Sequence, residues 1–228
     1  MFPNLSEDLR RYGRYRQQVK ALLFAPRVWA IVAYRFARWV HTARLPSIIR
    51  LPLKALVTII AVYVDIASSI ELPPQVAIGP GLFIPHTGYI VVGSTSTIGR
   101  HCTLTQGVTI GHRGGGQVSS FAGPVIGDRV YIGPGAAVLG PIDIGDDVLI
   151  GANAVVTRSV PARAVVTGSP ARVISMKGSF DLISYDWREH DAERAASLAA
   201  GESEPISGIG EAADGRRSED EMSSSVSV

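Results

Sequence analysis

The sequence has one cysteine, Cys102, among its 228 residues. A lone cysteine cannot form a disulfide within the chain, and zinc sites built on paired cysteines are excluded as well. A reducing, cytoplasmic location is therefore expected. The first residues contain arginines but no apolar core of a signal peptide, and the longest uncharged apolar stretch, residues 55–64, is too short to span a bilayer. The sequence thus predicts neither secretion nor a transmembrane helix.

Acidic residues are scarce near the N-terminus. Residues 1–54 contain eleven Lys/Arg against Glu7 and Asp8, a balance of +9, whereas the whole chain carries +2. No motif that reads nucleic-acid bases accompanies this charge, so no nucleic-acid partner is expected. Two interpretations stay open. In the first, which is the commoner arrangement, the helices cover one end of a core and their arginines face solvent. In the second, the basic segment makes peripheral contact with an anionic membrane.

Helical patterns fill residues 1–69. Ser6, followed by two acidic residues, is typical of a capped helix start. A second helix is expected after Pro26, with a buried apolar stripe, and a third over 53–67, after Pro52 has ended what precedes it. The stripe of the second helix consists of Trp29, Val32, Ala33, Phe36, Trp39 and Val40.

Beyond residue 70, aliphatic side chains recur every six residues. The first set is Ile126, Ile132, Val138, Ile144, Ile150 and Val156. A second set, four residues after each, is Val130, Ala136, Ile142, Val148, Ala154 and Val160. A six-residue unit is too short for a helix pair or a propeller blade, but it fits a short strand and a corner. The sequence therefore predicts a mainly β fold, a hexapeptide solenoid of parallel strands over 70–175.

Two features interrupt this period. The phase shifts by two residues inside "GYIVVG", 88–93, beside His86, an imidazole in an apolar run that would need partners for both nitrogens if buried. The glycine-rich segment "HRGGGQVSSFAGP", 112–124, is expected to be an excursion loop, either a binding loop or a passive insertion. After the solenoid, a polar helix is expected over 176–200 and a disordered tail over 201–228.

Four segments carry a family resemblance: "HTGYIVVG" at 86–93, "LTQGVTIG" at 104–111, the loop 112–124, and "VTGSPARV" at 166–173. They resemble the hexapeptide-repeat acyltransferases, and among these serine O-acetyltransferase, over about residues 68–175. The resemblance implies a left-handed parallel β-helix, a homotrimer with clefts between neighbours, and acetyl-CoA bound along an edge of the solenoid. No metal is expected.

The resemblance also implies roles for single residues. His86 matches the family's catalytic histidine, and Glu71 falls where the family has the partner aspartate, fifteen residues earlier. A hydroxyl is a poor nucleophile until a base takes its proton, and a carboxylate on the other ring nitrogen orients that base. The residues expected to contact acetyl-CoA are Gly133, Pro134, Gly151, Ala152 and Arg172.

The acceptor is the part of the family pattern that this sequence does not keep. Pro85 stands where the family has an aspartate before the catalytic histidine, and Gly123 where it has a histidine before the proline that closes the loop. Both positions are associated with recognition of a charged amino acid. The acceptor therefore stays open between serine and a sugar hydroxyl of a surface polysaccharide precursor, with His112 and Arg113 as expected contacts.

Two other classes of function are weighed. A metal-dependent hydratase on the same kind of solenoid needs three histidines on zinc, and His86, His101 and His112 are available but lack the close histidine pair of such sites. A non-catalytic scaffold has no need of a carboxylate matched to a histidine. Both alternatives are remote beside acyl transfer.

Overall fold

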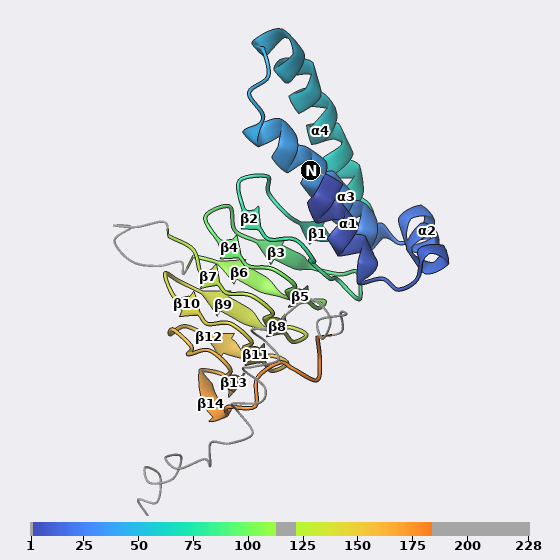
Figure 1. Cartoon of the computed structure of the whole chain (residues 1–228). Helices are drawn as coiled ribbons and strands as arrows, with labels where there is room; N and C mark the ends of the chain where they lie inside the picture. The colour runs from blue at the N-terminus through green and yellow to red at the C-terminus, as the bar shows by residue number, and fades with distance from the viewer. Residues whose placement is uncertain (1, 113–121, 184–228) are drawn as a thin grey trace, which may run out of the picture. The chain divides into compact units, whose positions relative to one another are not determined.

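The computed structural model describes residues 2–112 and 122–183 (Figure 1). Helices come first, and they are α1 (Phe2–Arg10), α2 (Tyr15–Phe24), α3 (Pro26–Thr42) and α4 (Ser47–Ser68). The strands that follow are β1 (Ile70–Glu71), β2 (Ala77–Ile78), β3 (Ile90–Val92), β4 (Thr97–Ile98), β5 (Thr103–Leu104), β6 (Thr109–Gly111), β7 (Val125–Ile126), β8 (Tyr131–Ile132), β9 (Ala137–Leu139), β10 (Asp143–Ile144), β11 (Leu149–Ile150), β12 (Val155–Val156), β13 (Val165–Gly168) and β14 (Ala171–Ser175).

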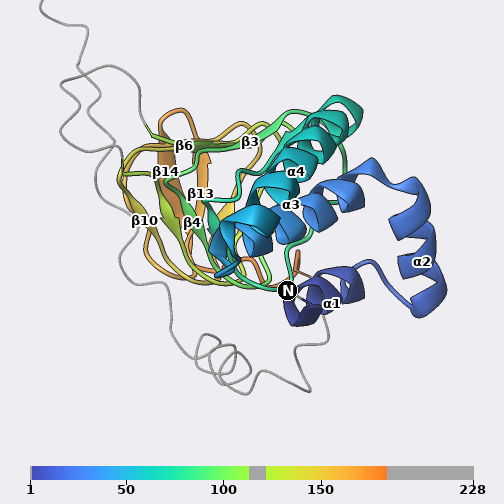
Figure 2. The ribbon, with the colours of Figure 1, turned by 90° about the horizontal axis from the view of Figure 1, so that it is seen from above.

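The strands form the three faces of a left-handed parallel β-helix (Figures 1 and 2). Face A contains β1, β3, β6, β9 and β12; face B contains β2, β4, β7 and β10; face C contains β5, β8, β11, β13 and β14. Every strand pair is parallel except β13 with β14, whose antiparallel pairing ends the solenoid. The chain runs from face B to face C to face A, which defines a B–C edge, a C–A edge and an A–B edge.

The two predicted ladders of aliphatic side chains form the core of the prism. All twelve of their members are buried, from Ile126 to Val160. Their earlier counterparts, such as Ile84, Leu104 and Ile110, are buried with them. Because each strand contributes only two to five residues, the stacked ladders rather than long strands supply the apolar surface that stabilises the fold. The hexapeptide prediction is confirmed.

The phase shift of the sequence corresponds to one enlarged corner. Paired residues Ile78 and Ile98 are 20 positions apart, whereas the paired residues Ile126 and Ile144 are 18 apart. In the next pairing along face A, Val92 and Ile110 are again 18 positions apart. The two additional residues therefore lie between Ile84 and Val91, in a corner where Tyr89 has a φ of 46°. The corner at 85–89 bulges outward on the C–A edge.

A buried ion pair attaches the helices to the first coil of the prism. The guanidinium of Arg35, on α3, donates to the carboxylate of Asp8, on α1, at 2.7 Å, and to the carbonyl of Ile78 at 2.7 Å. The same carboxylate accepts from the backbone N–H of Leu82 at 2.8 Å. Desolvating two charges is costly, and these charge-assisted hydrogen bonds offset the cost while fixing where the helices sit.

The helices differ from the sequence prediction in their boundaries and faces. Ser6 lies inside α1 rather than at its start, and α2 was not predicted. The predicted stripe of α3 is not its buried face, since Trp29 and Trp39 are 37% and 38% exposed and only Val40 of the stripe is buried. The helix instead turns Tyr34 and Arg35 to the prism, because these side chains hydrogen-bond the backbone of its first coil.

Helix α4 is longer than predicted. It begins at Ser47 and continues through Pro52, although Pro52 donates no backbone hydrogen bond. Packing against α3 holds the two halves in one helix. At 22 residues, α4 is long and apolar enough to cross a membrane by length and composition, which the stretch 55–64 alone did not indicate.

The segment after β14 does not begin as the predicted C-terminal helix. Residues 176–183 form bends and turns, and the Ser179 hydroxyl donates to the carbonyl of Arg129 at 2.6 Å. The remainder of that helix and the tail over 201–228 lie outside the described residues.

The burial of His101 predicts that the stability of this fold depends on pH. Burial above all, and then the charges of Arg11, Arg100 and Arg129, lower its pKa from 6.5 to about 4. The folded state favours the neutral ring. The contribution of His101 to the free energy of unfolding is therefore complete above pH 6.5 and falls as the pH approaches 4. Between pH 7.5 and 4.5 the loss should be about 2 kcal/mol.

Urea unfolding of His101→Gln at both pH values checks this expectation. The variant should lose less stability on acidification than the wild type by about 2 kcal/mol. His41→Gln, which alters an exposed histidine on α3, is the control and should behave as the wild type. Equal acid sensitivity in all three proteins would contradict the role of His101.

Candidate active site

His86 lies in the enlarged corner of the C–A edge, between the buried residues Ile84 and Ile90. Its side chain is exposed in the single chain, so it does not carry the desolvation cost of a buried imidazole. Backbone hydrogen bonds hold the corner: the N–H of Gly88 donates to the carbonyl of Ser68 at 3.1 Å, and that of Ile90 to Ser69 at 3.0 Å. The corner thus presents His86 to solvent on a fixed backbone.

Glu71 lies on β1, paired in register with Val91 of β3, and its side chain is exposed. Asp65, at the end of α4, has its pKa raised by burial and, secondarily, by the negative charge of Glu71. Within residues 2–112 and 122–183, Glu71 forms no hydrogen bond or ion pair with His86. Glu71 lies on β1, and His86 lies in the corner that leads into β3, the strand paired with β1.

The C–A edge continues from His86 along the prism as a column of stacked corners. The N–H of Gly107 donates to the carbonyl of Gly88 at 2.9 Å. The next two steps are equivalent: Gly135 N–H to Gln106 carbonyl at 2.9 Å, and Asn153 N–H to Pro134 carbonyl at 2.8 Å. The corners of this column are residues 85–89, 105–108, 133–136 and 151–154.

Four of the expected cofactor contacts lie in this column, and the fifth follows it. The four are Gly133, Pro134, Gly151 and Ala152. Arg172 is the second residue of β14, on face C, paired with Thr167 of β13, and it is exposed. The structure therefore places His86 and the first four candidates along one edge, with Arg172 on the last strand of face C.

Packing alone accounts for glycine at position 133. A Cβ atom there would lie 2.7 Å from the backbone nitrogen of Ala152 and 2.8 Å from the carbonyl oxygen of Ile150. No side chain fits between the two stacked corners. Gly133 is therefore required by the fold whether or not a cofactor contacts it.

Gln106 is a member of the column to which the sequence assigned no role. It lies between the corner of His86 and that of Pro134, and its side-chain oxygen is buried without a hydrogen-bond partner among the described residues. Its position in "LTQGVTIG", one of the family-like segments, was the available signal.

The expected acceptor residues lie elsewhere in the single chain. His112 is exposed and follows β6, where face A ends and the A–B edge begins. Arg113 lies outside the described residues. Gly123 has no room for a side chain, because a Cβ atom would lie 2.7 Å from the Ser96 hydroxyl and 2.9 Å from the Ser96 nitrogen. Face A separates this edge from His86.

The histidines needed by a hydratase are not together in one chain. His101 lies on the B–C edge, His86 on the C–A edge and His112 on the A–B edge. The described residues contain no cluster of three or more metal-ligating side chains.

Burial raises the pKa of the Cys102 thiol to about 12, so this group is no thiolate nucleophile at neutral pH.

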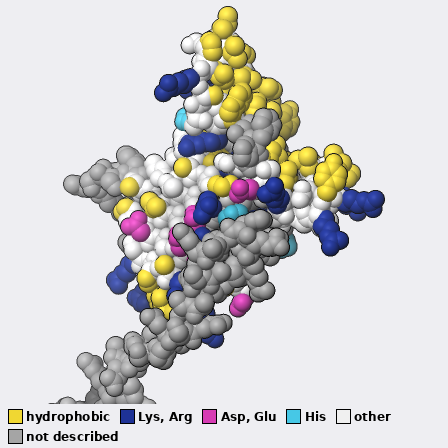
Figure 3. Space-filling model, in the orientation of Figure 1, with side chains coloured by type: hydrophobic (Ala, Val, Ile, Leu, Met, Phe, Trp, Pro, Cys, Tyr) yellow, Lys and Arg dark blue, Asp and Glu magenta, His cyan; other side chains and the backbone are white. Residues whose placement is uncertain are grey.

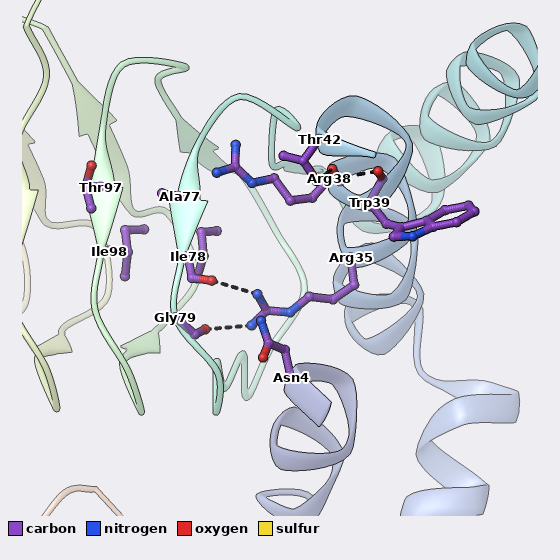
Figure 4. A pocket seen from close by; sticks show the side chains of 10 residues that line it. All are labelled: Asn4, Arg35, Arg38, Trp39, Thr42, Ala77, Ile78, Gly79, Thr97 and Ile98. Atoms are coloured by element: carbon purple, nitrogen blue, oxygen red, sulfur yellow. Dashed lines mark hydrogen bonds between the residues drawn. The ribbon is translucent and has the colours of Figure 1, made fainter. Parts of the chain in front are cut away.

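A surface cavity of about 490 Å³ lies on another side of the prism, beneath α3 and against β2 and β4 (Figure 4). Its two guanidinium groups are engaged by the fold: Arg35 binds Asp8 and the backbone of the first coil, and Arg38 donates to the carbonyls of Pro74 and Gln75. No general base lines it. This cavity is separate from the C–A edge.

The β-helix and the residues on its C–A edge are those of a hexapeptide-repeat transferase. The family model for bacterial transferase hexapeptides (six repeats) matches residues 123–158. A serine acetyltransferase of Synechococcus elongatus is 38% identical over 182 residues, which cover 78% of this chain and 70% of the relative. This chain belongs to the serine acetyltransferase family, and it is an O-acetyltransferase of that type.

Solved structures agree with this assignment. The serine acetyltransferase from Brucella abortus in complex with coenzyme A has a TM-score of 0.66 and 29% identity, covering 78% of this chain and 68% of that one. The Neisseria gonorrhoeae serine acetyltransferase in complex with serine has a TM-score of 0.62 and 29% identity, covering 76% and 69%.

Glu71→Gln tests whether this carboxylate acts on His86. The amide keeps the size of the side chain but not its charge, so it can no longer stabilise an imidazolium. We expect kcat to fall by about tenfold or more, with coenzyme A affinity by calorimetry unchanged. Asp181→Asn, an exposed carboxylate outside the edge, is the matched control. If Glu71→Gln loses coenzyme A binding, Glu71 is a structural residue.

Proposed function

We propose that the chain transfers the acetyl group of acetyl-CoA to an acceptor hydroxyl, with His86 as the general base. The observation that carries this proposal is the column on the C–A edge, where His86 and four candidate cofactor contacts are stacked by backbone hydrogen bonds. A relative of 29% identity binds coenzyme A, which supports the same class of donor here. Acetyl-CoA as donor and an unpaired buried cysteine both fit a cytoplasmic reaction.

The proposed reaction is a direct transfer. His86 takes the proton of the acceptor hydroxyl as its oxygen attacks the thioester carbonyl. The new C–O bond forms, the C–S bond breaks, and the proton passes from the imidazolium to the departing sulfur, which leaves as the thiol of coenzyme A. Glu71 stabilises the imidazolium in between, once the bound acceptor and cofactor have ordered the exposed pair.

We propose a homotrimer as the working assembly. His86 and the segment that begins at His112 lie on different edges of one prism, so a single chain does not bring them together. A cyclic assembly places the C–A edge of one copy against the A–B edge of the next, and closed cyclic symmetry is the usual result of a self-associating face. The acceptor then lies between two copies.

Serine is the acceptor that the names of the relatives indicate, and the Neisseria gonorrhoeae relative binds it. A second candidate, an uncharged hydroxyl such as that of a hexose, is favoured by Pro85 and Gly123. Free serine has an ammonium and a carboxylate, and burying either without a partner costs several kcal/mol. Pro85 has no charge to offer, and Gly123 has no space for a side chain.

His86→Ala tests the base. The fold and the trimer should be retained, because the side chain is exposed and makes no hydrogen bond among the described residues. Acetyl transfer should fall by about two orders of magnitude or more, measured as release of free thiol from acetyl-CoA. His41→Ala serves as the control. Near wild-type turnover in His86→Ala would remove this mechanism.

An acceptor panel with purified protein and acetyl-CoA distinguishes the two candidates. We expect serine to saturate poorly and hexose-containing acceptors to be used better. Pro85→Asp, which places a carboxylate where the family has one, should lower the KM for serine by about tenfold and leave the KM for a hexose unchanged. Saturable acetylation of serine at sub-millimolar concentration by the wild type would overturn the preference for an uncharged acceptor.

A further inference from the structure

Helix α4 is apolar on two opposite faces. Half-buried residues recur at helical spacing on the face that packs against α3, namely Leu53, Val57, Ile60, Ala61 and Val64. An amphipathic helix of a globular protein has polar side chains opposite such a face, whereas a helix that is apolar all round is covered on every side. Here α3 covers one side only.

The opposite face forms a continuous exposed strip, named here the α4 stripe. Its members are Ile48, Leu51, Ala55, Ile59, Val62 and Ile66. Ile48, Leu51 and Ile66 are 84%, 74% and 76% exposed, and Tyr63 beside them is 71% exposed. The stripe extends over about 27 Å. Figure 3 shows it as hydrophobic surface along the helix that projects from the prism.

The charged residues of the chain that flank the first half of the α4 stripe are all cations, whereas Asp65 and Glu71 lie at its other end. Arg44, Arg50 and Lys54 lie at or before its first half, and Asp65 is the only acidic residue on the helix. Residues 1–54 contain eleven cations in all against two acids; Asp8 and Arg35 are buried together in their ion pair and Arg11 is buried as well, which leaves nine cations and one acid. A second copy of this surface would bring like charges together, whereas anionic lipid headgroups complement them.

We propose that the α4 stripe docks on an anionic lipid bilayer, with its apolar side chains inserted at the headgroup boundary and the neighbouring cations on the headgroups. The commoner arrangement for the basic segment, helices with a solvated arginine face, does not describe α4. Burial of apolar side chains together with attraction of cations to anionic lipids is the physical basis of interfacial helices. This inference does not depend on the proposed acetyl transfer.

The helix lies on the membrane rather than across it. Helix α3 packs along α4, and α3 is tied to the prism through Tyr34, Arg35 and Arg38. A spanning α4 would carry these arginines and the edge of the first coil into hydrocarbon, where charges and open sheet edges are costly. Docking through one face leaves all of these contacts intact.

Flotation of the full chain with 100 nm vesicles tests the proposal. One set contains phosphatidylcholine alone, and the other contains phosphatidylcholine with about 30% phosphatidylglycerol, a composition that supplies negative surface charge. The wild type should float with the anionic vesicles, with affinity at least about tenfold above that for the neutral ones. Raising NaCl to about 1 M, where the Debye length is about 3 Å, should reduce this binding.

Two variants separate the apolar and charged contributions. Leu51→Ser/Ile59→Ser/Ile66→Ser on the stripe should lose binding to anionic vesicles by about tenfold or more. Arg44→Gln/Arg50→Gln/Lys54→Gln, which keeps the apolar stripe, should lose the preference for anionic over neutral vesicles. The matched control is Ile174→Ser/Met176→Ser/Leu182→Ser, which alters three exposed apolar residues at the other end of the solenoid and should bind as the wild type.

Light scattering and circular dichroism without vesicles accompany each measurement, the first to show that the variants keep the wild-type assembly and the second to show that they keep its fold. Equal flotation with neutral and anionic vesicles, absence of flotation, or unchanged flotation of the stripe variant would each overturn the proposal. A stripe variant of lower oligomeric mass than the wild type would also overturn it, because the stripe would then be a contact between copies. Failure of acetyl transfer, with flotation intact, leaves this inference standing.

Discussion

The stacking of each corner directly on the corner of the next coil is the constraint on which the structure depends. Short strands supply few hydrogen bonds, so the coils hold together only if their inward aliphatic residues align and their corners fit closely. Gly133 shows how close that fit is, because a Cβ atom would lie 2.7 Å from the backbone of the adjacent corner. A rigid edge of this kind suits a long cofactor, since contacts far apart in sequence recur at fixed positions along one line.

The enlarged corner at His86 is the point where this regularity is relaxed. Two additional residues between Ile84 and Val91 bulge out of the C–A edge, and Gly88 and Ile90 anchor the bulge to the residues that precede Glu71. The same departure that interrupts the period therefore gives the imidazole an exposed position on a fixed backbone. A catalytic group needs this combination, because its ring has to reach substrate while its geometry stays defined.

The sequence allowed the prism to be predicted almost completely, and the helices much less well. The ladders from Ile126 to Val160 are periodic because every coil meets the same neighbours, so the pattern is local and repeated. The buried face of α3 is set by single hydrogen bonds between residues far apart in the sequence, such as those of Arg35 with Asp8 and Ile78. Such bonds leave no periodic pattern in the sequence, so they could not be predicted from it. For the site, resemblance indicated His86 and the edge residues, but the separation of His86 from His112 by face A is a property of the folded coil alone.

The α4 stripe and the C–A edge are joined at one end of the molecule. Helix α4 ends at Ser68, three residues before Glu71, and the carbonyl of Ser68 accepts the hydrogen bond from Gly88 in the corner of His86. In the proposed docking, a bilayer bound to the stripe lies against the same end of the prism as the proposed base. For free serine this position gives no advantage in reaching the site, since a small soluble acceptor can diffuse to any exposed edge. For a hydroxyl on a lipid-linked sugar it shortens the search from three dimensions to a surface, and Pro85 and Gly123 leave such an uncharged acceptor without an electrostatic penalty. The proposed docking surface and the uncharged residues at positions 85 and 123 therefore support the same proposed class of acceptor from independent features of the chain.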